Sequence, residues 1–415
     1  MRNLSFVEKL LDGVEVEWKP LGQLGEFIRG NGLQKKDFVD NGFPAIHYGQ
    51  IYTKYGLSAD KTFTFVSNEL AVKLKKAIKN DLLLATTSEN DEDVVKPLAW
   101  LGEQAAISGD MMLFRHSENV KYLAYCFQTN AFQEQKRKYI TGAKVRRVSS
   151  GDLAKVEVPI PCPDNPEKSL AIQAEIVRIL DAFTAMTAEL TAELTAELNL
   201  RKKQYNYYRD QLLSFEDGEF EWKTLEHLCT SISAGGDVPK NSSKGQTAPT
   251  DEYPYPIYAN ATGEKALYGF TDDYKIDSDA VTISARGAKV GYHTVREAKF
   301  TPIIRLIVLI ANKNIVSTRY LNYVLDMTPI GGTEAGIPQL TVPMVKKLTV
   351  PIPFPNDPKK SLFEQARIVS ILDKFDTLTT SIQEGLPREI ELRQKQYEYY
   401  RDLLLSFPQP KEVVA

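Results

Sequence analysis

The stretch VPIPCPDNPEKSLAIQAEIVRILDAF at residues 158–183 recurs as VPIPFPNDPKKSLFEQARIVSILDKF at residues 350–375. A second stretch, RKKQYNYYRDQLLSF at 201–215, recurs as RQKQYEYYRDLLLSF at 393–407, so both repeats share an offset of 192 residues. An EWK-x-L segment also opens each half, at Glu17 and at Glu221. The intervening stretches, roughly 22–150 and 226–342, show no comparable match. The chain therefore consists of a frame that is used twice and of two inserts that differ in sequence.

The repeated frame predicts a long helix in each half. Prolines between 159 and 166 stiffen the lead-in, and apolar residues then recur at intervals of three and four, from Ile172 to Leu212 and again from Ile368 to Leu404. About 44 helical residues at ~1.5 Å each would make a rod on the order of 65 Å. A single apolar stripe does not stabilise such a helix alone. We therefore expect the two copies to pack on each other as an antiparallel coiled coil.

A tetrapeptide, TAEL, occurs three times in succession between Thr187 and Leu198. Each unit is slightly more than one helical turn and lengthens a helix by about 6 Å. This pattern is typical of an ordinary Ala/Leu/Glu helix, and equally of a ruler whose length changes by whole units. At the corresponding place the second copy has Gly385-Leu386-Pro387, which predicts an interruption of the second helix.

Composition indicates a globular protein, because 43% of the 415 residues are apolar and 25% are charged. The three cysteines, Cys126, Cys162 and Cys229, form neither a C-x-x-C pair nor a metal-ligand spacing, so we expect no disulfide framework and no zinc site. No apolar run is long enough to cross a bilayer and the N-terminus lacks a signal-peptide pattern. These features predict a cytoplasmic protein without a membrane partner.

The net charge of −3 hides an uneven distribution. Residues 18–155 carry 20 Lys+Arg against 15 Asp+Glu, and residues 222–347 carry 14 against 12, so the acidic excess lies in the frame. Positive inserts within a slightly acidic chain are expected where the inserts alone face phosphate. The distribution therefore favours a nucleic acid as the partner of the inserts.

Both inserts look α/β, since short apolar or β-branched runs alternate with helical stretches. Basic, aromatic and amide side chains cluster within them, partly in loops that follow predicted strands. Arg and Lys can hold phosphates or pair with guanine, and Asn or Gln can read adenine. The candidate DNA-binding residues are Arg29, Lys35, Lys36, His47, Tyr48, Gln50, Tyr52, Lys54, Thr87, Ser88, Asn90, Lys138, Lys144, Arg146 and Arg147 in the first insert, and Lys240, Lys244, Tyr258, Asn260, Arg286, Lys289, Tyr292 and His293 in the second.

No catalytic equipment is recognisable in the sequence. The chain contains no Gly-Lys dipeptide, which excludes a Walker A motif, and it lacks the Asn/Asp-Pro-Pro-aromatic tetrapeptide of amino-methyltransferases. Its four histidines show no spacing that suggests a catalytic pair. We therefore expect no catalytic residue, no cofactor-binding residue and no metal ligand in this chain.

The duplicated VPIP…Q-x-x-IV-x-ILD-x-F block, the R-x-KQY-x-YYRD-x-LLSF block, the EWK starts and the TAEL tandem together resemble the specificity subunit of type I restriction-modification enzymes, most closely the IC subfamily. The resemblance implies a non-catalytic subunit that binds double-stranded DNA through two target recognition domains. Each domain would read one half of a bipartite, asymmetric site, and the TAEL copy number would set the gap between the halves.

The resemblance also implies partners. Two methyltransferase subunits would use S-adenosylmethionine to methylate adenine, and two restriction subunits would use ATP and Mg to translocate and cleave DNA. The duplicated tyrosines exceed what one helix stripe requires, and we expect Tyr207 and Tyr399, which lie off the stripe, to help dock the methyltransferase subunits.

The predicted fold class is two α/β (α+β) recognition domains separated by two long helices in an antiparallel coiled coil, with a pseudo-two-fold internal repeat. The expected domains are 1–155, the first recognition domain with an N-terminal conserved segment; 156–215, a central conserved region with the spacer helix; 216–347, the second recognition domain; and 348–415, a C-terminal conserved region with the second long helix and tail. Two alternatives stay open: a self-contained DNA methyltransferase or nuclease, and a coiled-coil scaffold without DNA specificity.

Overall fold

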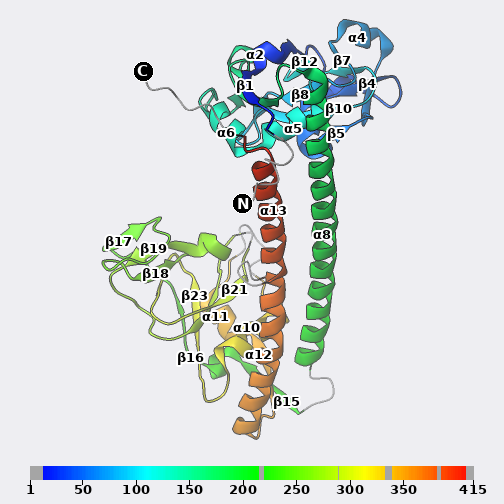
Figure 1. The fold of residues 1–415 in the computed structure, drawn as a ribbon. Helices are drawn as coiled ribbons and strands as arrows, with labels where there is room; N and C mark the ends of the chain where they lie inside the picture. The colour runs from blue at the N-terminus through cyan, green and yellow to red at the C-terminus, as the bar shows by residue number, and fades with distance from the viewer. Residues whose placement is uncertain (1–12, 215–218, 288, 332–338, 381–384, 408–415) are drawn as a thin grey trace, which may run out of the picture. The chain divides into compact units, whose positions relative to one another are not determined.

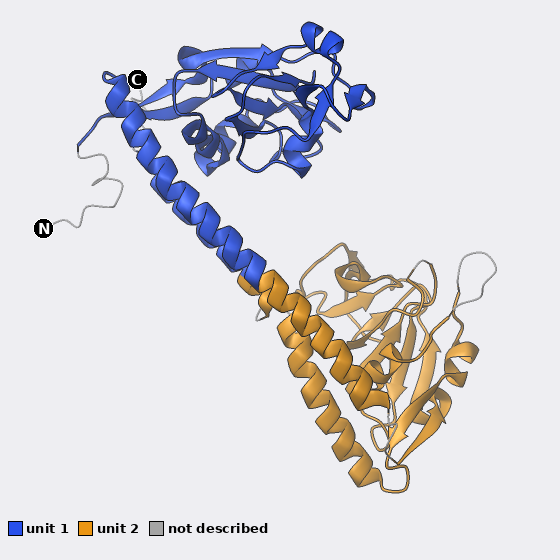
Figure 2. Cartoon of the chain, turned by 90° about the vertical axis from the view of Figure 1, so that its right-hand side faces the viewer, with its two compact units in different colours: residues 1–193, 390–415 blue, residues 194–389 orange. Residues whose placement is uncertain are grey.

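The structure, a computed structural model, describes residues 13–214, 219–287, 289–331, 339–380 and 385–407 (Figure 1). The chain forms two compact units, one of residues 1–193 with 390–415 and the other of residues 194–389 (Figure 2). Unit 1 and unit 2 denote these two bodies below. The C-terminal segment therefore belongs to the same unit as the N-terminal insert, although the two lie at opposite ends of the sequence.

Unit 1 contains two five-stranded sheets. The first has the order β2 (Gly25–Arg29), β12 (Met111–His116), β8 (Leu82–Ala85), β10 (Lys96–Trp100) and β5 (Ser58–Ala59). The second has the order β3 (Phe38–Val39), β6 (Thr64–Val66), β4 (Phe43–Ile46), β11 (Ala105–Ile107) and β7 (Lys76–Ala77). The shorter elements around them are α2 (Leu21–Leu24), η1 (Lys35–Asp37), α3 (Tyr48–Thr53), α4 (Asn68–Lys73), α6 (Asn130–Arg137) and α7 (Ser150–Leu153). Helix α5 (Val120–Gln128) packs on β8 and β10 and buries most of its residues there.

Unit 2 contains two four-stranded sheets. The first has the order β16 (Cys229–Ala234), β23 (Ile307–Ala311), β20 (Ala280–Ile283) and β21 (His293–Arg296). The second has the order β17 (Ser242–Lys244), β19 (Leu267–Thr271), β18 (Tyr255–Tyr258) and β22 (Thr301–Pro302). The shorter elements are α9 (Leu225–Leu228), η2 (Gly263–Ala266) and α11 (Val342–Lys347). Helix α10 (Thr318–Asp326) packs on β20 and β21.

The two inserts share the topology of four strands in each sheet although their sequences show no comparable match; β5 and β7 are additional edge strands of unit 1. β2, β12, β8 and β10 are joined by antiparallel ladders, and so are β16, β23, β20 and β21 in the same order. In the second sheets, two antiparallel ladders are followed by one parallel ladder, along β3–β6–β4–β11 and along β17–β19–β18–β22. The duplication therefore extends through the inserts, because strand order and burial pattern can persist when residue identities do not.

The frame contributes one further strand pair to each unit. β1 (Val16–Pro20) carries the first EWK segment and pairs antiparallel with β14 (Glu157–Pro161), placing Trp18 opposite Pro159. β15 (Phe220–Thr224) pairs in the same way with β24 (Thr349–Pro353), placing Trp222 opposite Pro351. These two-stranded ladders leave one edge of each proline-rich strand free of ladder bonds, which is the position a strand proline tolerates.

The long helices match the expectation closely. α8 (Pro166–Ser214) is a continuous helix of 49 residues that includes all three TAEL units. In the second copy, α12 (Pro358–Thr380) ends and α13 (Leu386–Leu404) begins with Pro387 in its first turn, so the expected interruption is present; residues 381–384 lie outside the described ranges.

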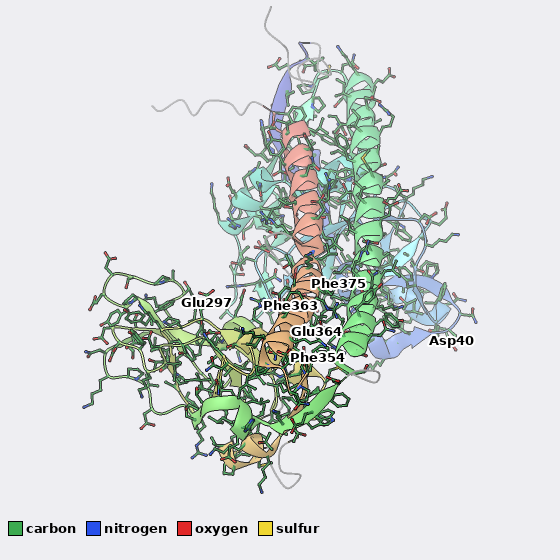
Figure 3. All side chains as sticks on the ribbon, turned by 90° about the horizontal axis from the view of Figure 1, so that it is seen from below. Asp40, Glu297, Phe354, Phe363, Glu364 and Phe375 are labelled. Atoms are coloured by element: carbon green, nitrogen blue, oxygen red, sulfur yellow. The ribbon has the colours of Figure 1, made fainter. Side chains whose placement is uncertain are left out.

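Helix packing is antiparallel within each unit. In unit 1, α8 lies beside α13 (Figure 1): the Thr184 hydroxyl is 3.0 Å from the Tyr397 hydroxyl, and the Phe183 and Tyr400 ring centroids are 6.1 Å apart. In unit 2, Phe375 of α12 faces the end of α8 (Figure 3), with its ring centroid 5.6 Å from that of Tyr208. The expected fold class, with α/β recognition domains, antiparallel long helices and an internal repeat, is confirmed.

Each insert is joined to its frame helix by the same set of buried bonds. Gln173 and Gln365 are fully buried, and their side-chain oxygens accept the backbone N–H groups of Asn119 and Ser317, which precede α5 and α10. The Tyr122 hydroxyl likewise donates to the Pro159 carbonyl, as the corresponding tyrosine of α10 does to Pro351. A buried polar group needs such partners, so these bonds fix where each insert sits on its helix.

Candidate nucleic-acid interface

The loop that follows β8 in unit 1 is held by hydrogen bonds from the side chains of Tyr52 and Lys136. The Tyr52 hydroxyl lies 2.9 Å from the Thr87 carbonyl oxygen and 3.3 Å from that of Asp93. Lys136 is buried, with 1% of the residue exposed. Its ammonium group donates to the carbonyls of Glu92 and Val94 at 3.0 and 2.9 Å. Burial lowers the pKa of Lys136 to about 8. The loop that carries several predicted DNA contacts is therefore held in one conformation rather than left free.

Three of the predicted residues, Arg29, Thr87 and Arg147, line one cavity of about 280 Å³ in unit 1. β9 (Thr87–Ser88) pairs antiparallel with β13 (Arg146–Arg147), so Thr87 and Arg147 lie on facing strands. Arg29 reaches the cavity from the end of β2, where its Nε donates to the Gly109 carbonyl at 3.2 Å. The tertiary structure thus brings together residues that are more than 50 positions apart in the sequence.

Other predicted residues of unit 1 use their polar atoms within the unit. His47 and Gln50 are each 8% exposed; the imidazole Nδ1 of His47 accepts the Gly49 N–H, and the Gln50 side chain accepts the His47 N–H. Burial lowers the pKa of His47, and Lys35 lowers it further, whereas Asp110 opposes the change. Asn90 exchanges two hydrogen bonds with Asp93.

The remaining predicted residues of unit 1 differ in exposure and in whether their side chains already have a partner. Arg146 pairs with Asp91 at 2.7 Å, and the Ser88 hydroxyl accepts the Asn90 N–H. Tyr48 is half-buried, and its backbone N–H donates to Ser108. The exposed cations are Lys35, Lys36, Lys54, Lys138 and Lys144, of which Lys54 lies over the Phe63 ring.

In unit 2 the predicted residues gather on two neighbouring loops. The Asn260 amide donates to the Arg286 carbonyl at 3.0 Å and its side-chain oxygen accepts the Ala285 N–H. The Tyr292 hydroxyl accepts the Gly263 N–H at 3.4 Å, and the Tyr292 N–H donates to the Lys289 carbonyl. The side chains of Arg286, Lys289 and Tyr292 are exposed. All three lie on the loop between β20 and β21, which corresponds in topology to the loop after β8.

The other predicted residues of unit 2 lie outside this loop. Lys240 and Lys244 are exposed at β17, and Lys244 lies over the Tyr268 ring. The His293 ring bonds to Asp326 of α10 at 3.2 Å. Burial alone would lower the pKa of His293, but the bonds to Asp326 and to the Gly291 carbonyl outweigh burial and raise it. His293 therefore joins β21 to α10 instead of pointing to solvent.

Sequence reasoning missed three residues near these surfaces. The Arg296 guanidinium stacks on the Tyr258 ring at 3.9 Å, Lys136 fastens the loop after β8, and Gln339 pairs through its backbone with Arg286. Each contact crosses between elements that are remote in the sequence. No local spacing could have indicated them.

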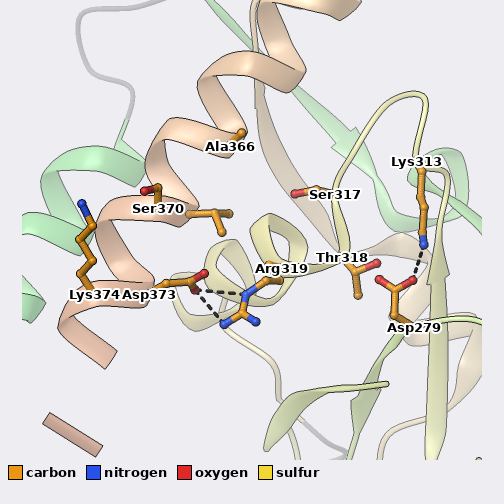
Figure 4. Close-up of a pocket in the computed structure, with 10 residues that line it drawn as sticks. Asp279, Lys313, Ser317, Thr318, Arg319, Ala366, Ser370, Asp373 and Lys374 are labelled. Atoms are coloured by element: carbon orange, nitrogen blue, oxygen red, sulfur yellow. Dashed lines mark hydrogen bonds and ion pairs between the residues drawn. The ribbon is translucent and has the colours of Figure 1, made fainter. Parts of the chain in front are cut away.

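A larger cavity, about 630 Å³, lies between α10 and α12 in unit 2 (Figure 4). Its charges are largely balanced, because Lys313 pairs with Asp279 and Arg319 pairs with Asp373 (Figure 4). Burial would raise the pKa of Asp279, but hydrogen bonds from Lys313 and Thr318 lower it. A balanced cavity of this kind offers a polyanion little attraction.

Two tyrosines stand out on the helices. Tyr207 and Tyr399 are 58% and 63% exposed, and their rings contact those of Tyr208 and Tyr400 edge to face. The Tyr207 hydroxyl also accepts a hydrogen bond from the Gln211 amide at 2.8 Å. Phe363 of α12 is 74% exposed (Figure 3). Within the described ranges, no three His, Cys, Asp or Glu side chains are placed to hold a metal ion. None of the helices that the structure describes is long and apolar enough to span a membrane.

Comparisons with known proteins agree with these features. The family profile described as the type I restriction modification DNA specificity domain matches residues 13–200 and 218–392. The type I restriction enzyme EcoR124I/EcoR124II specificity subunit of Escherichia coli is 39% identical over 446 aligned residues, with 100% of both chains covered. The EcoprrI specificity subunit of Escherichia coli is 35% identical, with 92% of this chain and 93% of that protein covered.

Solved structures support the fold. A chain from a study of complex assembly and conformational transition of the type I R-M system superposes with a TM-score of 0.59 at 15% identity, covering 94% of this chain and 97% of that one. The HsdS subunit from Thermoanaerobacter tengcongensis gives a TM-score of 0.50 at 15% identity, covering 94% and 95%. The curated relatives are named specificity subunits, which confirms the expected class and a role other than catalysis. Two family domains in one chain, carried by two inserts of equal topology, show that this protein belongs to the type I restriction-modification DNA specificity subunits.

Proposed function

We propose that the recognition domains of this specificity subunit, within 1–155 and 216–347, each read one half of a bipartite, asymmetric site in double-stranded DNA. The observation that carries the proposal is the equal topology of the two inserts combined with different side chains at corresponding loops. Unit 1 presents Thr87 and Arg147 where unit 2 presents Arg286 and Gln339. One backbone plan with two sets of donors and acceptors is what two different half-sites require.

The proposal assigns DNA contact first to the predicted side chains whose polar groups are exposed. In unit 1 these are Arg29, Arg147 and the exposed lysines, and in unit 2 they are Arg286, Lys289 and Tyr292. His47, Gln50, Asn90, Asn260 and His293 are proposed to shape the surface, because their polar atoms already have partners inside the unit.

Two measurements test this function. Sequencing of methylated adenines in cells that carry the gene with its partner genes should reveal one bipartite site. Replacement of both Arg286 and Lys289 by alanine should then relax or abolish reading of one half of that site and leave the other half intact. The function is refuted when the purified complex binds cognate and random duplexes equally well.

We further propose that the conserved regions 156–215 and 348–415 dock two methyltransferase subunits, partly through Tyr207 and Tyr399. Exposed aromatic side chains in equivalent places on both long helices fit a partner present in two copies. Replacing both tyrosines with alanine should reduce co-purification of the methyltransferase subunit. The matched control is Asn206→Ala with Glu398→Ala, since these exposed residues precede the tyrosines directly. Undiminished assembly of the tyrosine variant would remove these residues from the interface.

We propose that the complex acts in the cytoplasm and that its cofactors are bound by the partner subunits. S-adenosylmethionine would be bound by the methyltransferase subunits, and ATP and Mg by two restriction subunits. Native mass spectrometry of the assembled complex would count the subunits. Methyl transfer by the purified chain alone would instead support a self-contained methyltransferase, and the absence of any duplex preference would support a coiled-coil scaffold.

A further inference from the structure

We propose that the cavity lined by Arg29, Thr87 and Arg147 in unit 1 binds one phosphate of the DNA backbone between its two guanidinium groups. This inference rests on the proposed DNA-binding function and adds a defined anchoring site to it. The site would fix the position of unit 1 along the duplex and would carry no sequence information of its own.

The first support is the unpaired charge of the cavity. The Arg29 Nε bonds to the Gly109 carbonyl, which holds the guanidinium in place while its Nη groups make no other bond in the described part of the chain. The Arg147 side chain makes neither a hydrogen bond nor an ion pair with any described residue. Among the described residues that line the cavity none carries a carboxylate, in contrast to the charge-balanced cavity between α10 and α12.

The second support is the shape of the site. Base edges lie inside the grooves of a duplex and are read by elements that protrude into them, whereas a phosphate projects outward and can enter a hollow. A volume of about 280 Å³ accommodates a phosphate with its sugar oxygens and ordered water. Guanidinium groups match phosphate oxygens in pairs, which strengthens such a contact.

The third support comes from the hydroxyls at the cavity wall. Thr87 is 8% exposed, and its Oγ1 has no hydrogen-bond partner among the described residues. Thr86, beside it, already donates to the Asp110 carbonyl at 3.0 Å. A buried hydroxyl without a partner is costly, and a rotation about χ1 toward an incoming oxygen would satisfy it.

Unit 2 provides an internal comparison. Arg29 stands opposite Met112 in the ladder of β2 and β12, and the residue in the corresponding ladder position of unit 2 is Ala234, opposite Ile307. The returning strand carries Arg147 in unit 1 and Gln339 in unit 2. This pair of guanidinium groups is therefore specific to unit 1, and Gln339 of unit 2 supplies a matched neutral position for a control variant.

The test uses the full chain in complex with its methyltransferase subunits and a cognate duplex in which single phosphates are replaced by neutral methylphosphonates. In the unaltered complex, neutralising one phosphate in the half-site of unit 1 should weaken binding by about tenfold. Arg29→Ala with Arg147→Ala should weaken cognate and random duplexes by similar factors, and lower the slope of log K against log salt by roughly 1. That methylphosphonate should then cause no further loss.

Control variants separate charge from geometry and from folding. Gln339→Ala, at the unit 2 counterpart of Arg147, should leave the salt slope unchanged. Arg29→Lys with Arg147→Lys should retain most of the slope because the charge is kept. Removal of Arg29 also removes its hydrogen bond to Gly109 and so lowers the stability of unit 1. Arg147→Ala alone breaks no side-chain bond within the described chain, so its affinity and salt slope test the phosphate site without this effect.

The competing outcomes are distinct. The arginine variants could remain sensitive to every methylphosphonate and yet no longer discriminate between guanine and 7-deazaguanine. That result would overturn the inference, because it would show that the arginines read a base instead of holding a phosphate. Unchanged affinity and salt slope in Arg147→Ala would overturn it as well. If the unaltered complex binds no duplex selectively, the proposed function fails, and the anchoring site fails with it.

Discussion

The Tyr323 hydroxyl, near the end of α10, donates a 2.6 Å hydrogen bond to the carboxylate of Asp373 on α12. Unit 1 repeats this relationship, with the Tyr125 hydroxyl of α5 donating to Asp181 of α8 at 2.9 Å. Each aspartate also pairs with a cation of the insert, Arg319 in unit 2 and a lysine in unit 1. The same bond therefore joins each insert to its long helix, although the surrounding sequences differ.

Loss of this hydroxyl should loosen the insert. Tyr323→Phe is expected to reduce the stability of unit 2 by about 1–2 kcal/mol, because the half-buried Asp373 carboxylate then loses a hydrogen bond. Hydrogen exchange of the α10 amides should accelerate, while the amides of unit 1 keep their rates. Tyr125→Phe should give the mirror result, and Tyr207→Phe, on an exposed ring, should change neither.

Acid should weaken unit 1 through His116. This residue ends β12 with its ring 5.1 Å from the Phe114 ring, and burial lowers its pKa to about 4, although Asp81 acts in the opposite direction. The folded pKa lies below the unfolded value of 6.5, so the stability contributed by the neutral ring is complete above pH 6.5 and is lost as pH falls toward 4. The loss should approach roughly 3 kcal/mol.

The measurement for His116 is hydrogen exchange of the β8 and β12 amides between pH 7 and pH 4, corrected for intrinsic rates. His116→Phe should flatten the pH dependence of the opening free energy. A dependence that persists unchanged in this variant would assign the acid sensitivity to other groups. His227→Gln, an exposed position in unit 2, serves as the control.

Removal of one TAEL unit should change spacing alone. Residues 187–198 contribute to none of the buried clusters, and Leu190 is 36% exposed, so deletion of 191–194 removes no core residue. The deletion shortens a helix by about 6 Å, or one to two base-pair steps. Mapping of methylated adenines should show a gap shorter by about one base pair with both half-sites retained. An altered half-site, or an unchanged gap, would contradict the ruler.

Exchange of one insert should change one half-site. The β1–β14 ladder lies in the frame, and the Gln173 side chain accepts a backbone N–H of the insert, which an insert of the same topology also supplies. Replacing residues 22–150 by the insert of another specificity subunit should therefore retain the joint. The new complex should methylate a site with one foreign half and one original half. Changes in both halves would show that the inserts read DNA jointly.

Much of the site could be located by region but not by residue. The sequence placed Thr87 and Arg286 in loops after strands, because a polar run after an apolar one is a local pattern. It could not show that Arg29 and Arg147 share a cavity, or that Lys136 is buried beneath the loop that it fastens, since those contacts join distant segments. His47 and Gln50 looked like contacts because a residue type alone does not reveal burial.

The amino-acid sequence by itself determined the duplicated frame, the length of α8, the break before Leu386 and the family, because repeats, helical period and glycine or proline breaks are all local properties. Only the tertiary structure decided that the inserts share one topology and that the C-terminal helix completes unit 1. Both results depend on strand pairing and packing between segments up to hundreds of residues apart. Local sequence patterns do not show which of these distant segments pair.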